Sequence, residues 1–297
     1  MDLFSHLNWY RGNNVDGTPM KAVPSSKLIL IADTLGAEGS FVIHDVLQSV
    51  SKRDDMGVCL VGLNQSLFHY HSVGRKLGYN LTTENQKGHF SFINGLGSSY
   101  SWIEQLAAAA REEAGIEEEP PLDPISKGFQ PFPIQPLPAN SSSNNNTNKS
   151  DKSQFFKQLF ELLVKDHQQR MKKLQNSHTL FVIDNLNLLS SFGASDIDVL
   201  HFIQFCQSYV KEQANCSLLL LYHSDCTDDE TFLRLLQYES DLTLMVDGLK
   251  TGYSRDIDGQ IDFLQKREDN TLQRLSAIHY QVLDNSIRYF SMGSRIQ

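Results

Sequence analysis

Short, continuous apolar runs alternate with helical patterns through most of the chain. Five of these runs have the length of a strand: residues 27–32, 57–63, 89–93, 179–184 and 216–224. Between them, apolar residues recur at helical spacing, for example in residues 41–50, and a longer helix is predicted at about 195–213. Uninterrupted apolar runs of this length are typical of strands that are buried on both faces of a parallel sheet. The pattern predicts an α/β fold in which a mostly parallel, twisted sheet is flanked by helices.

The last third of the chain follows a different pattern. Four strand-like runs succeed one another with no helical pattern between them: residues 241–246, 260–266, 276–283 and 286–292. Turn sequences such as Asp284-Asn285-Ser286 separate them. Strands joined by short turns pair as antiparallel neighbours. We therefore expect an antiparallel extension of the sheet at its C-terminal end.

One segment differs in composition from the rest of the chain. Seven of the nine prolines lie between Pro120 and Pro138, after an acidic run and before a run of Asn and Ser. Such a segment has too little apolar surface to fold by itself. We expect a disordered Pro/Asn/Ser-rich loop at about residues 112–152. It interrupts a single domain that spans residues 26–297, and residues 1–25 form an N-terminal extension.

The charge and cysteine content exclude several classes of protein. There are 26 Lys and Arg residues against 35 Asp and Glu residues, a net charge of −9, so the chain lacks the overall basic footprint of a generic nucleic-acid binder. The four cysteines form no C-x-x-C pair, and no metal site is predicted. No run of 18 apolar residues occurs. We expect a soluble cytoplasmic protein with no membrane contact, and the nucleus is a second candidate compartment.

Residues 28–47 resemble the strand, turn and helix that surround a phosphate-binding loop. In the motif G-x-x-x-x-G-K-[ST], glycines expose backbone amides, the lysine reaches the phosphates and the hydroxyl binds Mg²⁺. If Gly39 is the second glycine, Thr34 replaces the first. Ser40 then replaces the lysine and Phe41 replaces the hydroxyl residue. The missing positive charge favours a turn that only joins strand to helix over a tight ATP site.

Two further parts of an ATPase site are altered. Asp184 ends an apolar run and matches the acid that supports Mg²⁺ in such ATPases, but without a hydroxyl at Phe41 it lacks a partner ligand. We interpret Asp184 as structural. After the second strand, Asn64 and Gln65 stand where a general base is required. These changes predict no catalytic residue and no cofactor, and an ATPase with an atypical loop remains the alternative.

A Gly-rich connection near the C-terminus carries a candidate contact site. Lys250, Tyr253 and Arg255 lie within eight consecutive positions, 248–255. Cations beside an exposed aromatic ring suit a phosphate backbone and a stacked base. A solvated loop with ordinary charges explains the same residues equally well.

The order of these features resembles a RecA-like ATPase domain, especially the group typified by the clock protein KaiC. Residues 260–270 and 278–290 are similar to the terminal hairpin of that group, where a basic pair projects toward the nucleotide of the neighbouring subunit. Arg267 occupies the arginine position, Gln265 replaces the preceding lysine, and Lys266 lies between them. The resemblance implies that Arg267, with Lys266, acts across a subunit interface.

Four longer motifs look like the family of the sixth subunit of the Elongator complex. They are "GSFVIHDVL", "CLVGLNQSLFHYHSVGRKLG", "FVIDNLNLLSSFG" and "GLKTGYSRDIDGQIDFLQKR". The likeness covers most of residues 26–292 except the Pro-rich loop, and that family has a RecA-like fold without a proper phosphate-binding loop.

This resemblance implies a non-catalytic role in a larger assembly. The chain would join the fourth and fifth Elongator subunits in a heterohexameric ring with two copies of each. The ring would bind tRNA, couple ATP to tRNA release and support the carboxymethyl-type modification of the wobble uridine, which a separate catalytic subcomplex performs. A RecA-like DNA-repair paralogue is a further alternative, but it needs a basic single-strand channel that the net charge of −9 does not favour.

Overall fold

The computed structural model describes residues 2–13, 17–95, 130–131, 147–174, 177–191, 193–224 and 230–292. The strands are β1 (Tyr10–Asn13), β2 (Pro19–Lys21), β3 (Leu28–Asp33), β4 (Met56–Gly62), β5 (Phe90–Asn94), β6 (Gln130–Pro131), β7 (His178–Ile183), β8 (Cys216–His223), β9 (Leu242–Asp247), β10 (Gly259–Lys266), β11 (Leu272–Leu283) and β12 (Ser286–Ser291). The helices are α1 (Leu3–His6), α2 (Ser40–Val50), α3 (Leu67–Leu77), α4 (Leu81–Lys87), α6 (Thr147–Lys173), α7 (Asn187–Ser191), α8 (Asp196–Glu212) and α9 (Glu230–Glu239). Within these ranges, no helix is both long enough and apolar enough to cross a membrane.

The main sheet confirms the predicted fold class. Its strand order is β12-β11-β10-β9-β3-β8-β7-β4-β5-β6. Pairing is parallel from β9 to β6 and antiparallel from β9 to β12. The C-terminal strands therefore form the expected antiparallel extension. Strands from both sides of the Pro-rich segment also share this sheet, because β4 pairs with β7.

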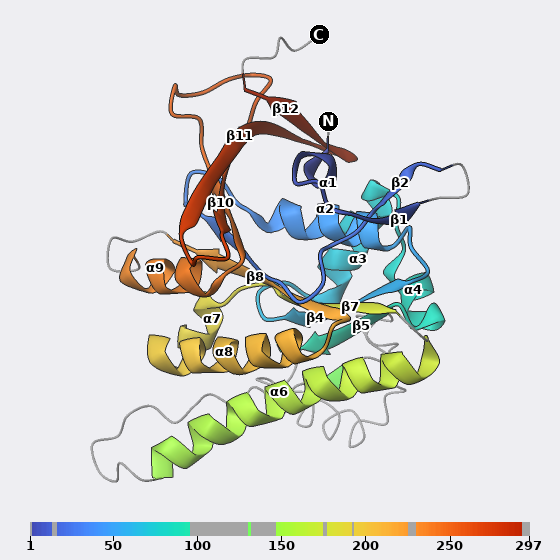
Figure 1. Ribbon diagram of the computed structural model, residues 1–297, viewed down its shortest axis with the longest axis vertical. Helices are drawn as coiled ribbons and strands as arrows, with labels where there is room; N and C mark the ends of the chain where they lie inside the picture. Colours follow the sequence, from blue (N-terminus) through green and yellow to red (C-terminus); the bar gives the residue numbers. More distant parts are fainter. Residues whose placement is uncertain are drawn as a thin grey trace, which may run out of the picture.

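Helices cover both faces of the sheet. In Figure 1, α2 and α3 lie on one face, and α6 and α8 lie on the other. Along β3, Ile29 and Ile31 face the first core while Leu28 and Leu30 face the second, since successive side chains of a strand point to opposite sides. Every residue of β3 is buried. Burial on both faces explains why this strand appears in the sequence as a continuous apolar run.

The N-terminal residues pack onto the antiparallel extension. Leu3 and Phe4 of α1 are buried in the same core as α2. The ring of His6 lies 5.0 Å from that of Phe263 in β10, and its Nε2 is 2.8 Å from the carbonyl of Ser276 in β11. Figure 1 shows α1 beneath β11 and β12. The residues expected as an N-terminal extension thus contribute to the core.

Part of the expected loop at residues 112–152 belongs to regular structure. Gln130 and Pro131 form β6 beside β5, and α6 begins at Thr147. The remainder of this expected loop lies outside the described residues.

A buried arginine holds α6 against the sheet. Arg170 is 3% exposed, and its Nη2 donates to the carbonyl of Val58, to Ser91 Oγ and to Asp166 Oδ2 at 3.1, 2.8 and 2.9 Å. Its Nη1 donates to the carbonyl of Gly88. A Cβ atom at Gly57 would lie 2.5 Å from this Nη1, so the approach requires glycine. One guanidinium group therefore connects α6 to two strands and to the end of α4.

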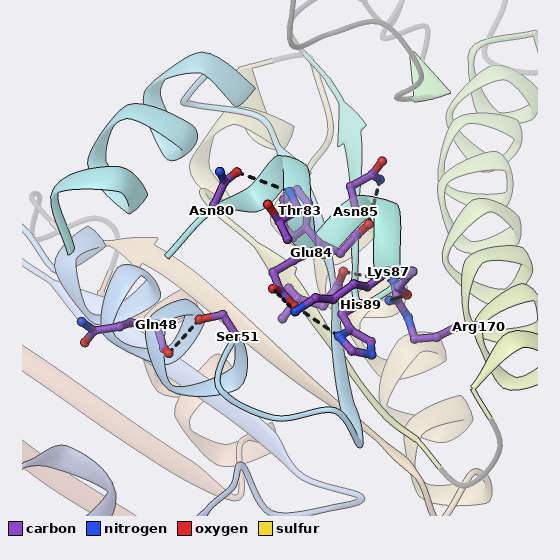
Figure 2. Close-up of polar contacts among 12 residues, drawn as sticks. Gln48, Ser51, Asn80, Thr83, Glu84, Asn85, Lys87, His89 and Arg170 are labelled. Carbon is purple, nitrogen blue, oxygen red and sulfur yellow. Dashed lines mark hydrogen bonds and ion pairs between the residues drawn. The ribbon is translucent and has the colours of Figure 1, made fainter. Parts of the chain in front are cut away.

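Ionisable side chains also contact one another at the end of α4, which Arg170 reaches. Glu84 of α4 accepts from Lys87 Nζ at 3.0 Å and contacts His89 Nδ1 at 3.2 Å. Figure 2 shows Arg170 extending from α6 toward this group. The α4 helix ends at Gly88, whose φ of 85° is the left-handed conformation that glycine adopts without strain. This turn presents the Gly88 carbonyl to Arg170.

We predict that Arg170→Ala lowers the free energy of unfolding by about 3–5 kcal/mol, because it leaves a carboxylate and buried carbonyls without their donor. Urea denaturation measures the loss. Lys172→Ala removes an exposed cation from the same helix and should cost less than about 0.5 kcal/mol. Equal losses for the two variants would contradict the role assigned to Arg170.

Candidate functional site

The carboxyl ends of five parallel strands form the edge where the expected ATPase residues lie. Strands β9, β3, β8, β7 and β4 are parallel neighbours, so their carboxyl ends face the same side. In open α/β sheets, ligands bind outside such an edge. Asp33 and His223 end β3 and β8, and Asp184 directly follows β7. We call this side of the sheet the carboxyl edge.

The loop at residues 34–39 is closed by its own hydrogen bonds. Thr34 and Ala37 form an isolated bridge, with the Ala37 amide 2.9 Å from the Thr34 carbonyl. The Thr34 hydroxyl donates to Asp247 Oδ1 at 3.0 Å. The Gly39 amide donates to Asp33 Oδ2 at 2.6 Å. The Gly39 amide, which would face a phosphate in an intact phosphate-binding loop, is therefore bound to a carboxylate of the same chain.

Close packing explains the glycine at position 39. A Cβ atom there would lie 2.9 Å from Ile31 Cγ2 and 3.2 Å from Asp33 Cβ. Any larger residue would push the start of α2 away from β3. Gly39 thus serves the contact between strand and helix as well as the hydrogen bond to Asp33.

Asp33 places a buried negative charge at the N-terminus of α2. The residue is 1% exposed, and its Oδ1 lies 2.5 Å from Nδ1 of His223. A helix N-terminus favours an anion through its dipole and its free amides. The hydroxyl of Ser40 donates to Glu38 Oε1 at 2.7 Å, so a second carboxylate lies close by. Two carboxylates of the chain, those of Asp33 and Glu38, therefore lie at the start of α2, and their negative charges oppose the approach of a phosphate.

Phe41 is part of the core. It is 8% exposed, and its ring stacks on Tyr280 of β11 with centroids 4.4 Å apart and planes at 29°. Stacked aromatic pairs contribute about 0.5–1.5 kcal/mol beyond the burial of their surface. The residue at the expected metal-ligand position thus joins α2 to the antiparallel extension.

Asp184 binds the backbone of the neighbouring loop. Its carboxylate accepts from the amides of Leu63, Asn64 and Gln65 at 2.6, 3.1 and 3.0 Å. The hydroxyl of Tyr70 donates to it at 3.1 Å. Burial raises the pKa of Asp184, and these hydrogen bonds oppose that rise. These donors lie in the loop after β4 and in α3, so the carboxylate fixes the end of β7 to these two segments.

Asn64 and Gln65, which follow β4 at the place where an ATPase requires a general base, donate their backbone amides to Asp184. Asn187, the first residue of α7, is joined to the end of β8 by a reciprocal pair of hydrogen bonds. Its Nδ2 donates to the His223 carbonyl and its Oδ1 accepts from the His223 amide, both at 2.8 Å. The polar groups of the carboxyl edge therefore satisfy one another.

Some members of this network were not identified from the sequence. Asp33, His223, Asn187 and Tyr70 hold the edge together. The pairs Tyr70–Asp184, Asn187–His223 and Asp33–His223 are 36 to 190 residues apart along the chain. The signal available in the sequence is a polar residue at the end of a buried strand, which applies to Asp33 and to His223. The described residues contain no cluster of three His, Cys, Asp or Glu side chains suited to a metal ion.

The two groups of expected contact residues lie at opposite ends of β10. Lys250, Tyr253 and Arg255 occupy the exposed loop between β9 and β10, at the carboxyl edge, and Tyr253 is 96% exposed. Lys266 ends β10 and Arg267 follows it at the other side of the sheet. Eight residues of strand separate the two sides by about 25 Å. The structure therefore does not bring these groups together.

Lys266 and Arg267 have different surroundings. Lys266 Nζ donates to the Tyr238 carbonyl at 2.7 Å and lies 4.6 Å from the centre of the Tyr238 ring. Arg267 is exposed, and its Nε donates to Gln273 Oε1 at 2.9 Å. Lys266 is thus bound to α9, whereas Arg267 lies exposed beside Gln273 at the start of the turn after β10.

Comparisons with known proteins place these features in a family context. The profile of the family described as Elongation complex protein 6 matches residues 11–117 and 137–284. Elongator complex protein 6 of Dictyostelium discoideum is 51% identical, with all of both chains covered. The human protein of that name is 29% identical over 95% of this chain and 96% of its own.

Solved structures match the fold. A KaiC-like protein from the archaeon Pyrococcus horikoshii aligns with a TM-score of 0.52 at 8% identity, over 93% of this chain and 92% of its own. An uncharacterised protein of the same organism aligns with a TM-score of 0.52 at 11% identity, over 94% and 96% of the two chains. At such low identity these matches support the KaiC-like arrangement of the sheet and helices alone.

We predict that Asp184→Asn lowers the free energy of unfolding by about 2–5 kcal/mol, because an NH2 group replaces one of the two acceptor oxygens and leaves buried donors without an acceptor. The loss should be the same with and without Mg²⁺ and ATP in thermal unfolding. Asp54→Asn changes an exposed carboxylate and should have little effect. A loss that appears only when Mg²⁺ and ATP are present would identify Asp184 as a ligand of the metal shell.

Proposed function

This chain belongs to the Elongator complex protein 6 family, and from that membership we propose that it is a non-catalytic RecA-like subunit of the Elongator accessory ring. Its partners in the ring are the fourth and fifth Elongator subunits, two copies of each chain forming a heterohexamer. The ring binds tRNA and supports the carboxymethyl-type modification of the wobble uridine. A separate catalytic subcomplex of Elongator performs that chemistry. We assign this chain to the cytoplasm, with the nucleus as a second candidate compartment.

One observation carries the non-catalytic part of this proposal. The amide of Gly39 is bound to Asp33, and Asp184 is bound to three amides and one hydroxyl. An ATP site would need the first group to face a phosphate and the second to face a metal ion. Binding ATP would therefore require breaking buried hydrogen bonds on both sides of β8, with no lysine at Ser40 to compensate.

The alternative of an ATPase with an atypical loop can be separated from this proposal. It requires measurable ATP turnover by the purified chain and nucleotide affinity in the micromolar range. A pseudo-ATPase subunit has neither property, although the complete ring can still hydrolyse ATP at sites that its partners provide.

The proposed tRNA contact is the loop between β9 and β10. Lys250, Tyr253 and Arg255 are exposed there. The exposed ring of Tyr253 suits stacking on an unpaired base, and the two cations suit the adjoining phosphates. Asp256 and Asp258 are exposed in the same loop, so the contact is local rather than part of a broad basic surface.

Native mass spectrometry tests the proposed assembly. The purified chain is mixed with the fourth and fifth Elongator subunits, and the mass of the product is measured together with its tRNA binding. We expect a ring with two copies of each chain that binds tRNA. A stable product that lacks this chain, or a complete ring that does not bind tRNA, would contradict the corresponding part of the proposal.

We predict that changing Lys250 and Arg255 to Glu weakens tRNA binding by the assembled ring at least tenfold near 0.1 M salt and reduces the salt dependence of binding. Filter binding at several salt concentrations measures both effects. The control changes Lys165 and Lys172 of α6, which are also exposed, to Glu and carries the same change in net charge. Equal weakening by the two double variants would indicate an effect of total charge and would exclude the loop as a specific contact.

A further inference from the structure

The exposed surface of α3 and α4 carries no acidic side chain. Between residues 66 and 88 the chain has one carboxylate, Glu84, which is buried and contacts Lys87. Arg75 and Lys76 are exposed in the last turn of α3, and no described residue forms an ion pair with either of them. The chain as a whole has a net charge of −9. This surface, called the α3–α4 face, is therefore a basic region of an acidic protein.

One side of α3 faces the core and the other faces solvent. The buried residues of the helix are Leu67, Tyr70, Gly74 and Leu77. On the other side, Phe68 is 54% exposed, and Ser72, Arg75 and Lys76 follow it at helical spacing. Phe68 and Arg75 are about 10 Å apart along the helix axis. The exposed side thus presents an aromatic ring at one end and two cations at the other.

Buried contacts hold the last turn of α3 in place. A Cβ atom at Gly74 would lie 2.6 Å from Cε2 of Tyr79, so the helix and the chain that follows it pack closely. The Tyr79 amide donates to the Gly74 carbonyl at 2.9 Å. Gln48 of α2 donates to the carbonyl of Leu77. The turn that carries both cations is therefore a rigid part of the fold, as a binding surface requires.

The polar groups of this face suit the backbone of RNA. The α4 helix packs against α3 and exposes Thr82, Thr83 and Gln86. Hydroxyl and amide groups join Arg and Lys as the donors that proteins present to phosphates. The exposed ring of Phe68 suits stacking on an unpaired base. The helix dipole explains two cations in the last turn of a helix, but it does not explain why both helices lack exposed acids.

The α3–α4 face begins at the same edge of the sheet as the loop between β9 and β10. Ser66 precedes α3 in the connection after β4, and β4 runs parallel to β9. The strands β3, β8 and β7 lie between them, so the two connections are roughly 20 Å apart at the usual spacing of strands. Phe68 and Tyr253 are thus exposed rings along one edge, and a single RNA molecule can reach both.

We propose that the α3–α4 face is a second contact surface for tRNA, with Arg75 and Lys76 bound to backbone phosphates and Phe68 stacked on an unpaired base. This rests on the proposed function, in which the assembled ring binds tRNA. The loop between β9 and β10 supplies the first contact. Two separate local surfaces allow a chain with a net charge of −9 to bind RNA without a broad basic surface.

The first test reverses the charge of the face in the assembled ring. Arg75→Glu combined with Lys76→Glu should weaken tRNA binding at least fivefold near 0.1 M salt and reduce its salt dependence, because two phosphate contacts are lost. The control reverses Lys165 and Lys172 of α6, on the other face of the sheet, with the same change in net charge. Filter binding at several salt concentrations measures both effects. Native mass spectrometry verifies that each variant has joined the ring.

The second test separates stacking from charge. Phe68→Leu keeps an apolar side chain but removes the ring, and it should weaken tRNA binding at least threefold at low and at high salt. The control, Phe205→Leu, removes a ring that is 68% exposed on α8, on the other face of the sheet, and should leave tRNA binding unchanged. Ultraviolet cross-linking of the unaltered ring to tRNA, followed by peptide mass spectrometry, should place a cross-link within residues 67–77.

Each outcome supports or overturns the assignment. If the unaltered ring does not bind tRNA, that part of the proposed function fails and this surface fails with it. If the unaltered ring binds tRNA and the α3 variants bind it no more weakly than their controls, the proposed function stands and the α3–α4 face is overturned. A folded variant that is absent from the ring would make the face a subunit contact instead. A variant ring that binds tRNA normally but loses the catalytic subcomplex would make it a protein-docking surface, which also overturns the assignment.

Discussion

The bond between the Asp33 carboxylate and the Gly39 amide determines what the carboxyl edge can do. At 2.6 Å it joins the end of β3 to the start of α2, and the other carboxylate oxygen contacts His223 at the end of β8. A helix N-terminus near a strand end is a place where α/β proteins bind phosphate. Here an internal carboxylate occupies that place. Three further features agree with an internal carboxylate at the start of α2. The loop at residues 34–39 is closed by its own hydrogen bonds, Phe41 is packed in the core, and the polar groups around β7 bind one another.

The fold could be predicted because a strand that is buried on both faces requires apolar residues at nearly every position. Residues 28–33 and 179–183 form strands covered on both faces, so nearly all of their side chains are apolar and the runs are continuous. The antiparallel extension was predictable from closely spaced runs and turns for a similar reason. Motif positions such as Ser40 and Phe41 could also be identified, since a motif is a local pattern.

The partners of the site residues could not be predicted in the same way. His223 is 190 residues from Asp33, and the Leu63 amide is 121 residues from Asp184. No periodicity links such positions, because their proximity results from the order of strands in the sheet. The separation of Lys250 from Arg267 has the same origin. They are close in sequence, but β10 runs between them, so Lys250 lies at the carboxyl edge and Arg267 lies at the other end of the strand.

The hydrogen bonds of Asp184 give this buried acid a structural role. A buried carboxylate costs several kcal/mol of desolvation, and apolar replacements of buried ionic groups are often neutral or stabilising. Stability alone therefore does not account for an acid at this position. The carboxylate is, however, an acceptor that can bind three consecutive amides, from Leu63 to Gln65, and so fix the direction in which the chain leaves β4. That direction leads the chain into α3, whose Leu67 and Tyr70 are buried in the core, and this role of Asp184 needs no bound nucleotide.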